Sequence, residues 1–102
     1  MNGHISTVLI IPSFNETHAL PELLSELKSG LTKQDAVIIM DDSSPVIFDE
    51  IRRKCLESTK DSASLLIFEN SGSKSGRSAA VRRGMELALT KFPSVEKILE
   101  CD

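Results

Sequence analysis

The chain has 102 residues, of which 40% are hydrophobic and 26% are charged, a composition typical of one compact domain with a single core. A formal net charge of −3 and the absence of Trp and Tyr disfavour nucleic acid and anionic membranes as partners. The apolar runs are far shorter than the roughly 18 residues that cross a bilayer. Because no basic segment precedes an apolar one at the N-terminus, a cytoplasmic location is expected.

Four short apolar runs predict strands. They lie at residues 7–12, 36–40, 64–68 and 97–101. The first three are continuous and rich in Ile, Val and Leu, as in central parallel strands that are covered on both faces. Apolar residues at helical spacing between these runs predict three helices. Those helices are expected at 20–31, 46–58 and 77–91.

The alternation of strands and helices predicts a three-layer, Rossmann-like α/β domain. Its parallel sheet is expected to have the strand order 3-2-1-4, with helices on both faces. Ligands bind such sheets beyond the carboxyl ends of the strands, where the strand order reverses. Gly84 lies inside the third helix, where it costs about 1 kcal/mol relative to Ala, so we expect it to pack closely against a neighbour.

Two adjacent carboxylates, Asp41 and Asp42, follow the second predicted strand directly. Ionised neighbours repel each other and resist burial, so both side chains are expected to face water, a cation or a ligand. The imino and amino groups of a base and the hydroxyls of a ribose suit these acceptors. A divalent cation is the chief alternative, and a solvated turn is the simplest one.

Two further segments at the same sheet edge carry binding chemistry. The stretch 70–78 is rich in Gly and Ser, contains Lys74 and Arg77, and leads into a helix, which suits a phosphate or diphosphate. It is neither a P-loop nor a dinucleotide fingerprint, and a flexible solvent loop is the alternative. After the first strand, Phe14 offers an apolar surface for a planar base and Glu16 offers an acceptor, although Phe14 as a core residue is equally consistent.

Four stretches together, VLIIPSFNE, VIIMDDSS, GSKSGRSAAVRRGMELA and ILECD, resemble the N-terminal half of an inverting family 2 glycosyltransferase of the GT-A fold. The resemblance is closest to the polyprenyl-phosphate (dolichol-phosphate) sugar transferases and runs from about residue 7 to residue 102. It implies a UDP- or GDP-linked sugar as donor and Mg²⁺ or Mn²⁺ as cofactor. The implied acceptor is a saccharide or a lipid phosphate.

The resemblance also assigns roles to residues. Motifs for base and ribose match Pro12, Phe14 and Glu16 after the first strand, and Asp41 and Asp42 after the second. The loop motif matches the segment from Lys74 to Arg77, and Asp102 matches the first Asp of the metal-binding D-x-D motif. The predicted nucleotide-sugar-binding residues are therefore Pro12, Phe14, Glu16, Asp41, Asp42, Lys74, Arg77 and Asp102, with Asp102 as the metal ligand.

The chain departs from the family pattern in ways that affect the expected activity. The second Asp of D-x-D, the acceptor-binding half and the general base of the family are not among its residues. We therefore expect residues 1–102 to be one nucleotide-sugar-binding half-domain, a truncated part of a longer enzyme, with weak or no nucleotide affinity and no turnover.

Two alternatives from other functional classes remain open. A receiver-like signalling module also has paired carboxylates at a strand end, but here the third strand ends in Glu69 and Asn70 instead of Asp. A non-catalytic interaction domain is the other alternative. Truncation is expected to leave the fourth strand as an uncovered apolar edge, where homodimerisation is a hazard.

Overall fold

The structure, a computed structural model, describes residues 4–71 and 76–101. Its elements, in chain order, are β1 (Thr7–Ser13), α1 (Ala19–Leu27), the single 3₁₀ turn η1 (Lys28–Gly30), β2 (Asp35–Asp41), α2 (Pro45–Ser58), β3 (Leu65–Asn70), α3 (Arg77–Lys91) and β4 (Lys97–Glu100). The predicted helix 20–31 is too long by one turn, because the α-helix ends at Leu27 and the chain tightens into η1. Among the described residues, no helix is long and apolar enough to cross a membrane.

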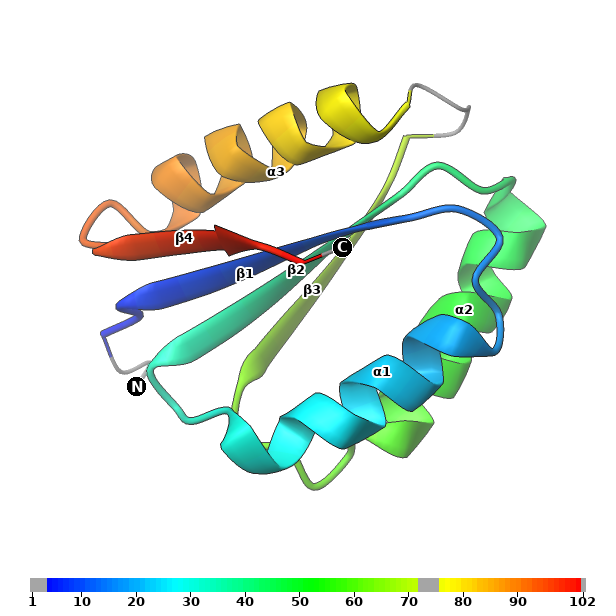
Figure 1. The fold of residues 1–102 in the computed structure, drawn as a ribbon, viewed down its shortest axis with the longest axis horizontal. Coiled ribbons are helices and arrows are strands. Elements are labelled where there is room, and N and C mark those ends of the chain that lie inside the picture. Colours follow the sequence, from blue (N-terminus) through cyan, green and yellow to red (C-terminus); the bar gives the residue numbers. More distant parts are fainter. Residues whose placement is uncertain (1–3, 72–75, 102) are drawn as a thin grey trace.

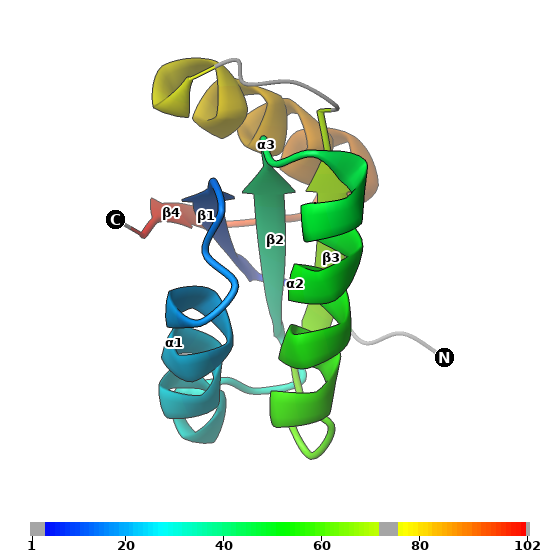
Figure 2. The same ribbon diagram turned by 90° about the vertical axis from the view of Figure 1, so that its right-hand side faces the viewer.

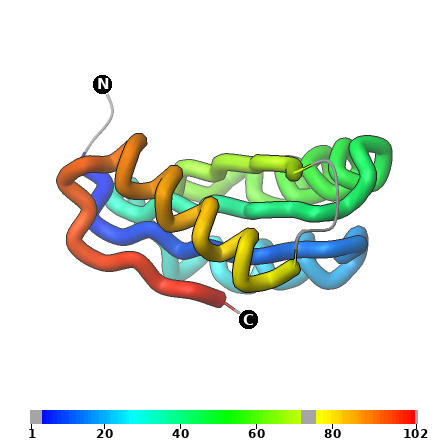
Figure 3. The backbone as a smooth tube through the Cα atoms, turned by 90° about the horizontal axis from the view of Figure 1, so that it is seen from above, coloured from blue at the N-terminus to red at the C-terminus, as the bar shows by residue number. Residues whose placement is uncertain are grey.

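The four strands form one parallel sheet in the order β3-β2-β1-β4, which confirms the predicted topology. Helices α1 and α2 cover one face of the sheet and α3 covers the other, as Figures 1 and 2 show. Seen from above, α3 runs obliquely across the sheet (Figure 3). The strand order reverses between β1 and β4, so the carboxyl end of β1 lies at the position where such sheets bind ligands.

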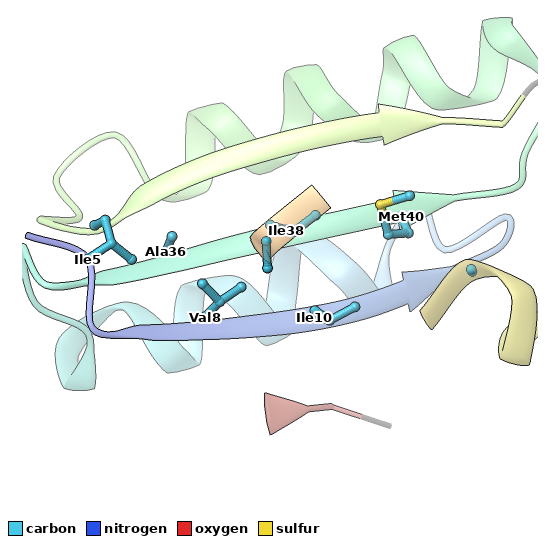
Figure 4. Packing of buried hydrophobic residues seen from close by; sticks show 8 residues of the cluster. Ile5, Val8, Ile10, Ala36, Ile38 and Met40 are labelled. Atoms are coloured by element: carbon cyan, nitrogen blue, oxygen red, sulfur yellow. The ribbon is translucent and has the colours of Figure 1, made fainter. Parts of the chain in front are cut away.

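Two hydrophobic clusters fill the spaces on either side of the sheet. Ile10 and Ile38 point toward α3, together with Met40, and Figure 4 shows these three side chains in the first cluster. Their neighbours Ile11 and Ile39 belong to the second cluster, under α1 and α2. Successive side chains on a strand alternate between faces, so a strand that is covered on both faces must be apolar throughout. The continuous runs in β1 and β2 follow from this requirement.

The third strand differs from the prediction. The side chains of β3 are half-buried or exposed along its whole length, and Leu65 is 43% exposed, so the expectation of a strand covered on both faces is wrong here. The reason is its place at the edge of the described sheet, while α3 packs over β1 and β2. At the opposite edge β4 pairs with β1, and Leu99 is 47% exposed. Homodimerisation through β4 stays a prediction.

Gly84 allows α3 to approach the sheet closely. A Cβ atom at this position would lie 2.7 Å from Ile10 Cγ2 and 3.1 Å from Met40 Cγ. Ile10 is fully buried, so it has little room to move away. The expected close packing of Gly84 is thereby confirmed, and the fixed height of α3 also sets the height of its first turn above the sheet.

The replacement Gly84→Ala is expected to destabilise the protein by about 1–3 kcal/mol through overpacking, although Ala is the better helix former. Urea unfolding of both variants and the wild type measures this. Gly30→Ala is the matched control, since an added Cβ there meets nothing within 4 Å, and it is expected to leave the unfolding free energy within about 0.5 kcal/mol. A Gly84→Ala protein as stable as the wild type would contradict the close packing.

Candidate functional site

The carboxylate of Asp41 joins the ends of three strands. It is fully buried at the end of β2. Its Oδ1 accepts hydrogen bonds from the hydroxyl of Ser13 in β1 at 2.8 Å and from that of Ser43 at 3.0 Å. Its Oδ2 accepts from the backbone N–H of Ser43 at 3.0 Å and lies 3.4 Å from Nδ2 of Asn70 in β3. These contacts fix the carboxyl edge of the sheet at its centre.

Asn70 and Ser43 extend this network to the backbone. The Asn70 amide donates to the carbonyls of Asp41 at 3.1 Å and Ser43 at 2.9 Å. The Ser43 hydroxyl accepts from the backbone N–H of Asn15 at 2.7 Å, and Asn15 has a left-handed φ of 55°, which Asn tolerates better than most residues. Asp41 thus also fixes the turn that carries Phe14 and Glu16.

Ser13, Ser43 and Asn70 were not among the residues predicted for the site. A signal was present, because the register pairs Ser13 with Asp41 and Asp41 with Asn70. Three adjacent parallel strands therefore end in polar residues at the same level. Strand ends aligned in this way supply hydrogen-bond partners to one another.

The expectation that both carboxylates face water, a cation or a ligand is wrong for Asp41, and it stays a prediction for Asp42, which lines a surface pocket. Asp41 is fully buried and Asp42 is 5% exposed. Both are satisfied by protein donors that replace water, and among the described residues no buried side-chain nitrogen or oxygen lacks a hydrogen-bond partner. Burial of a charged group is tolerated when such donors surround it.

Asp42 links the end of β2 to the start of α3. Its Oδ1 accepts from the hydroxyl of Ser71 at 2.7 Å and from Arg83 of α3 at 3.2 Å. Its Oδ2 accepts from the backbone N–H of Gly76 at 3.1 Å. Gly76 caps α3 with φ 91°, a conformation that side-chain-bearing residues rarely adopt. Asp42 therefore sets where α3 begins.

A pocket of about 300 Å³ lies where the ends of β1 and β2 meet the first turn of α3, on the side of the molecule toward which these strands run in Figure 1. Its lining residues are Pro12, Ser13, Phe14, Glu16, Asp42, Gly76, Arg77 and Ala80. Five of the eight predicted site residues are among them, namely Pro12, Phe14, Glu16, Asp42 and Arg77. Three separate sequence segments thus converge on one pocket.

The exposed residues of the pocket have distinct properties. Phe14 is 43% exposed, which excludes the alternative that it is a core residue. The carboxylate of Glu16 is also exposed. Arg77, in the first turn of α3, forms an ion pair with Glu100 of β4. The pocket therefore offers an apolar ring, a carboxylate and a guanidinium to a ligand.

The remaining predicted site residues are not in the pocket. Asp41 lies behind it, so its direct contact with a ligand stays a prediction, while its hydrogen bonds give it a structural role. Lys74 and Asp102 fall outside the described residues. Within residues 4–71 and 76–101, no group of three or more His, Cys, Asp or Glu side chains is placed to hold a metal ion. The described residues by themselves do not fit a divalent cation, which takes several oxygen ligands.

Two hollows of about twice this volume lie elsewhere among the described residues. One, of about 620 Å³, is at the amino edge of the sheet and includes His4, Lys33 and Lys91; the other, of about 600 Å³, lies between β3 and α3. Neither is lined by any of the five predicted site residues that line the 300 Å³ pocket, and of these three only that pocket lies at the carboxyl ends of both β1 and β2. We therefore take the smaller pocket as the candidate site.

The two cysteines take no part in this pocket. Cys55 is a free thiol. Cys55 is fully buried under the sheet. Burial raises the pKa of its thiol from 9.0 to about 12, and the nearby charge of Asp41 adds to this increase. The folded state therefore keeps Cys55 protonated, and the stability that this provides is lost only as the pH rises from about 9 toward 12.

The replacement Asp41→Ala is expected to cost about 3–5 kcal/mol of unfolding free energy, since it leaves several buried donors without their acceptor. Asp41→Asn keeps the shape of the side chain, but its NH₂ group replaces one of the two acceptor oxygens and faces the donors that this oxygen bound. A smaller loss of unfolding free energy, about 1–3 kcal/mol, is therefore expected. Chemical denaturation measures both, with the exposed Glu26 replaced by Ala as control. Equal stability of Asp41→Ala and Glu26→Ala would refute the structural role of Asp41.

Comparison with known proteins bears directly on this site. Residues 8–93 match the family model described as Glycosyl transferase family 2. No curated protein and no solved structure gives a significant match. The matched segment covers β1 through α3, including every described residue that lines the pocket, and the sheet order is consistent with the GT-A fold. The finer resemblance to polyprenyl-phosphate sugar transferases stays a prediction. The chain belongs to glycosyl transferase family 2.

Proposed function

We propose that the 300 Å³ pocket binds a nucleotide diphosphate sugar, the donor substrate of a glycosyltransferase. The observation that carries this proposal is the convergence of Pro12, Phe14, Glu16, Asp42 and Arg77, from three segments, around one pocket. Membership of glycosyl transferase family 2 supports it, because a glycosyltransferase of this family requires such a donor. The position at the carboxyl edge of a parallel sheet agrees with it as well.

The chemistry of the pocket suits the two ends of a nucleotide. Phe14 presents an exposed ring on which a base can stack, and the exposed carboxylate of Glu16 can accept hydrogen bonds from a base or a ribose. Asp42 already accepts from three described donors, so we assign it mainly to shaping the pocket. Uracil and guanine both offer N–H donors, so the proposal includes UDP- and GDP-linked sugars.

Arg77 and the first turn of α3 would receive the diphosphate. Free N–H groups at a helix N-terminus and a guanidinium together favour an anion. The Arg77–Glu100 pair is about half exposed, and exposed ion pairs contribute roughly 0–1 kcal/mol. A diphosphate is therefore able to compete with Glu100 for Arg77 at small cost.

The proposal extends to the reaction of the family. The family resemblance favours inverting transfer of the sugar to a saccharide or lipid phosphate acceptor, and we propose a cytoplasmic location for it. Mg²⁺ or Mn²⁺, with Asp102 as a ligand, would stabilise the leaving diphosphate. Residues 1–102 alone are proposed to bind the donor weakly and not to transfer it, because the resemblance assigns them donor-binding motifs and no general base.

Calorimetric titration of UDP, GDP and the nucleoside uridine, with and without Mn²⁺, tests donor binding. Arg77→Ala is expected to weaken diphosphate binding about tenfold through loss of a charge-assisted hydrogen bond, and to leave uridine binding unchanged. Arg82→Ala is the matched control, because Arg82 is an exposed arginine on the same helix.

Three results would contradict the proposal. The first is the absence of binding heat for every nucleotide at millimolar concentration. The second is an equal loss of diphosphate affinity in the Arg77 and Arg82 variants. Sugar transfer catalysed by the 102-residue chain would refute the proposed lack of turnover.

A further inference from the structure

Arg83 contacts Asp42, a residue of the candidate site, from outside the 300 Å³ pocket. Its guanidinium lies 3.2 Å from Asp42 Oδ1, but Arg83 itself lines the separate 600 Å³ pocket between β3 and α3, beside Asn70, Ser71 and Glu86. Asp42 lines the 300 Å³ pocket on the other side. The Asp42–Arg83 pair is therefore part of the wall between the two pockets.

We propose that Arg83 is a positioning residue of the nucleotide pocket: it holds the Asp42 carboxylate, which in turn holds Gly76 and the first turn of α3 at the pocket wall. The inference rests on the proposed function for the identity of the ligand. The chain of contacts from Arg83 to Asp42 to Gly76 is independent of it. Arg83 is not among the eight predicted site residues.

The burial of the two partners gives the contact its strength. The Asp42 side chain is 5% exposed and that of Arg83 is 36% exposed, so the carboxylate is shielded from water while the guanidinium is only partly so. Removal of one partner from a largely buried ion pair costs far more than removal of a surface pair, because the remaining charge is left in a poorly solvated place.

Gly76 is the residue through which a movement of the Asp42 side chain would alter the ligand site. Its backbone N–H donates to Asp42 Oδ2 at 3.1 Å, its left-handed φ of 91° begins α3, and it lines the pocket directly. Arg77, the proposed diphosphate contact, is the next residue. If the Asp42 carboxylate turns away from Gly76, the backbone that orients Arg77 therefore loses this hydrogen bond.

The neighbouring arginine provides an internal comparison. Arg82 is exposed and lies, with Arg77, Met85 and Glu100, around a different hollow. Both arginines occupy the middle of α3, so replacing either one changes net charge and helix propensity equally. A difference between the two variants thus reports on the contacts of Arg83, which include the Asp42 carboxylate.

The test uses the 102-residue chain with Arg83→Met, Arg83→Lys and Arg82→Met, after denaturation confirms that each variant folds. Amide hydrogen exchange at Gly76 and affinity for UDP are the two readouts. Arg83→Met is expected to speed Gly76 exchange about tenfold and to weaken UDP binding about tenfold, the scale of losing one charge-assisted hydrogen bond. Arg83→Lys keeps the charge but not the planar guanidinium, so its Gly76 exchange rate and UDP affinity are expected to lie between those of Arg83→Met and the wild type. Arg82→Met is expected to match the wild type in both.

The outcomes separate this inference from the proposed function. Unchanged Gly76 exchange in folded Arg83→Met overturns the inference, and so does faster exchange with unchanged UDP affinity. A wild-type chain that binds no UDP refutes the proposed function, while Gly76 exchange still decides whether Arg83 acts through Asp42. If Arg83→Met does not fold, Arg83→Lys decides: faster Gly76 exchange than in the wild type supports the inference, and equal exchange overturns it.

Discussion

The buried carboxylate of Asp41 is the constraint on which the site depends. A strand covered on both faces must be apolar along its length, yet the chain has to reverse where the strand ends. At the end of β2 this reversal takes place inside the protein, and Asp41 supplies the acceptors that Ser13 and Ser43 require. One charged group thereby fixes the strand ends and the turn after β1.

The second carboxylate, that of Asp42, connects these fixed strand ends to the wall of the ligand pocket. Asp42 contacts the end of β3 through Ser71 and the start of α3 through Gly76. The tight contact of Gly84 with Ile10 sets how close α3 lies to the sheet. The acidic pair thus has divided roles: Asp41 is structural, Asp42 shapes the pocket wall, and Glu16 and Arg77 are the charged groups most available to a ligand.

Much of the fold followed from local patterns. Continuous apolar runs are typical of strands that are covered on both faces, which holds for β1 and β2 but not for β3, and alternating strands and helices favour the parallel order that the structure has. The exposure of β3 was not predictable from its composition, since it depends on which strands α3 covers. The end of α1 was missed because Gly30 marks the end of the 3₁₀ turn η1 and not of the α-helix.

The site was predicted as a set of residues and not as a geometry. The motifs name Phe14, Glu16 and Arg77, which line one pocket because the carboxyl ends of parallel strands meet at one edge, and their binding of a ligand stays a prediction. The motifs did not reveal that Asp41 points inward. That direction is set by donors on other strands, such as Ser13 and Asn70, which become neighbours only through the register.

The most direct test of the account is a map of amide chemical-shift changes when UDP is added to the isotope-labelled chain. If the carboxyl edge is the binding site, the changes concentrate in residues 13–16, 42–43 and 76–77, which form or adjoin the 300 Å³ pocket. Changes concentrated instead around His4, Lys33 and Lys91, at the larger hollow on the amino edge, would contradict it.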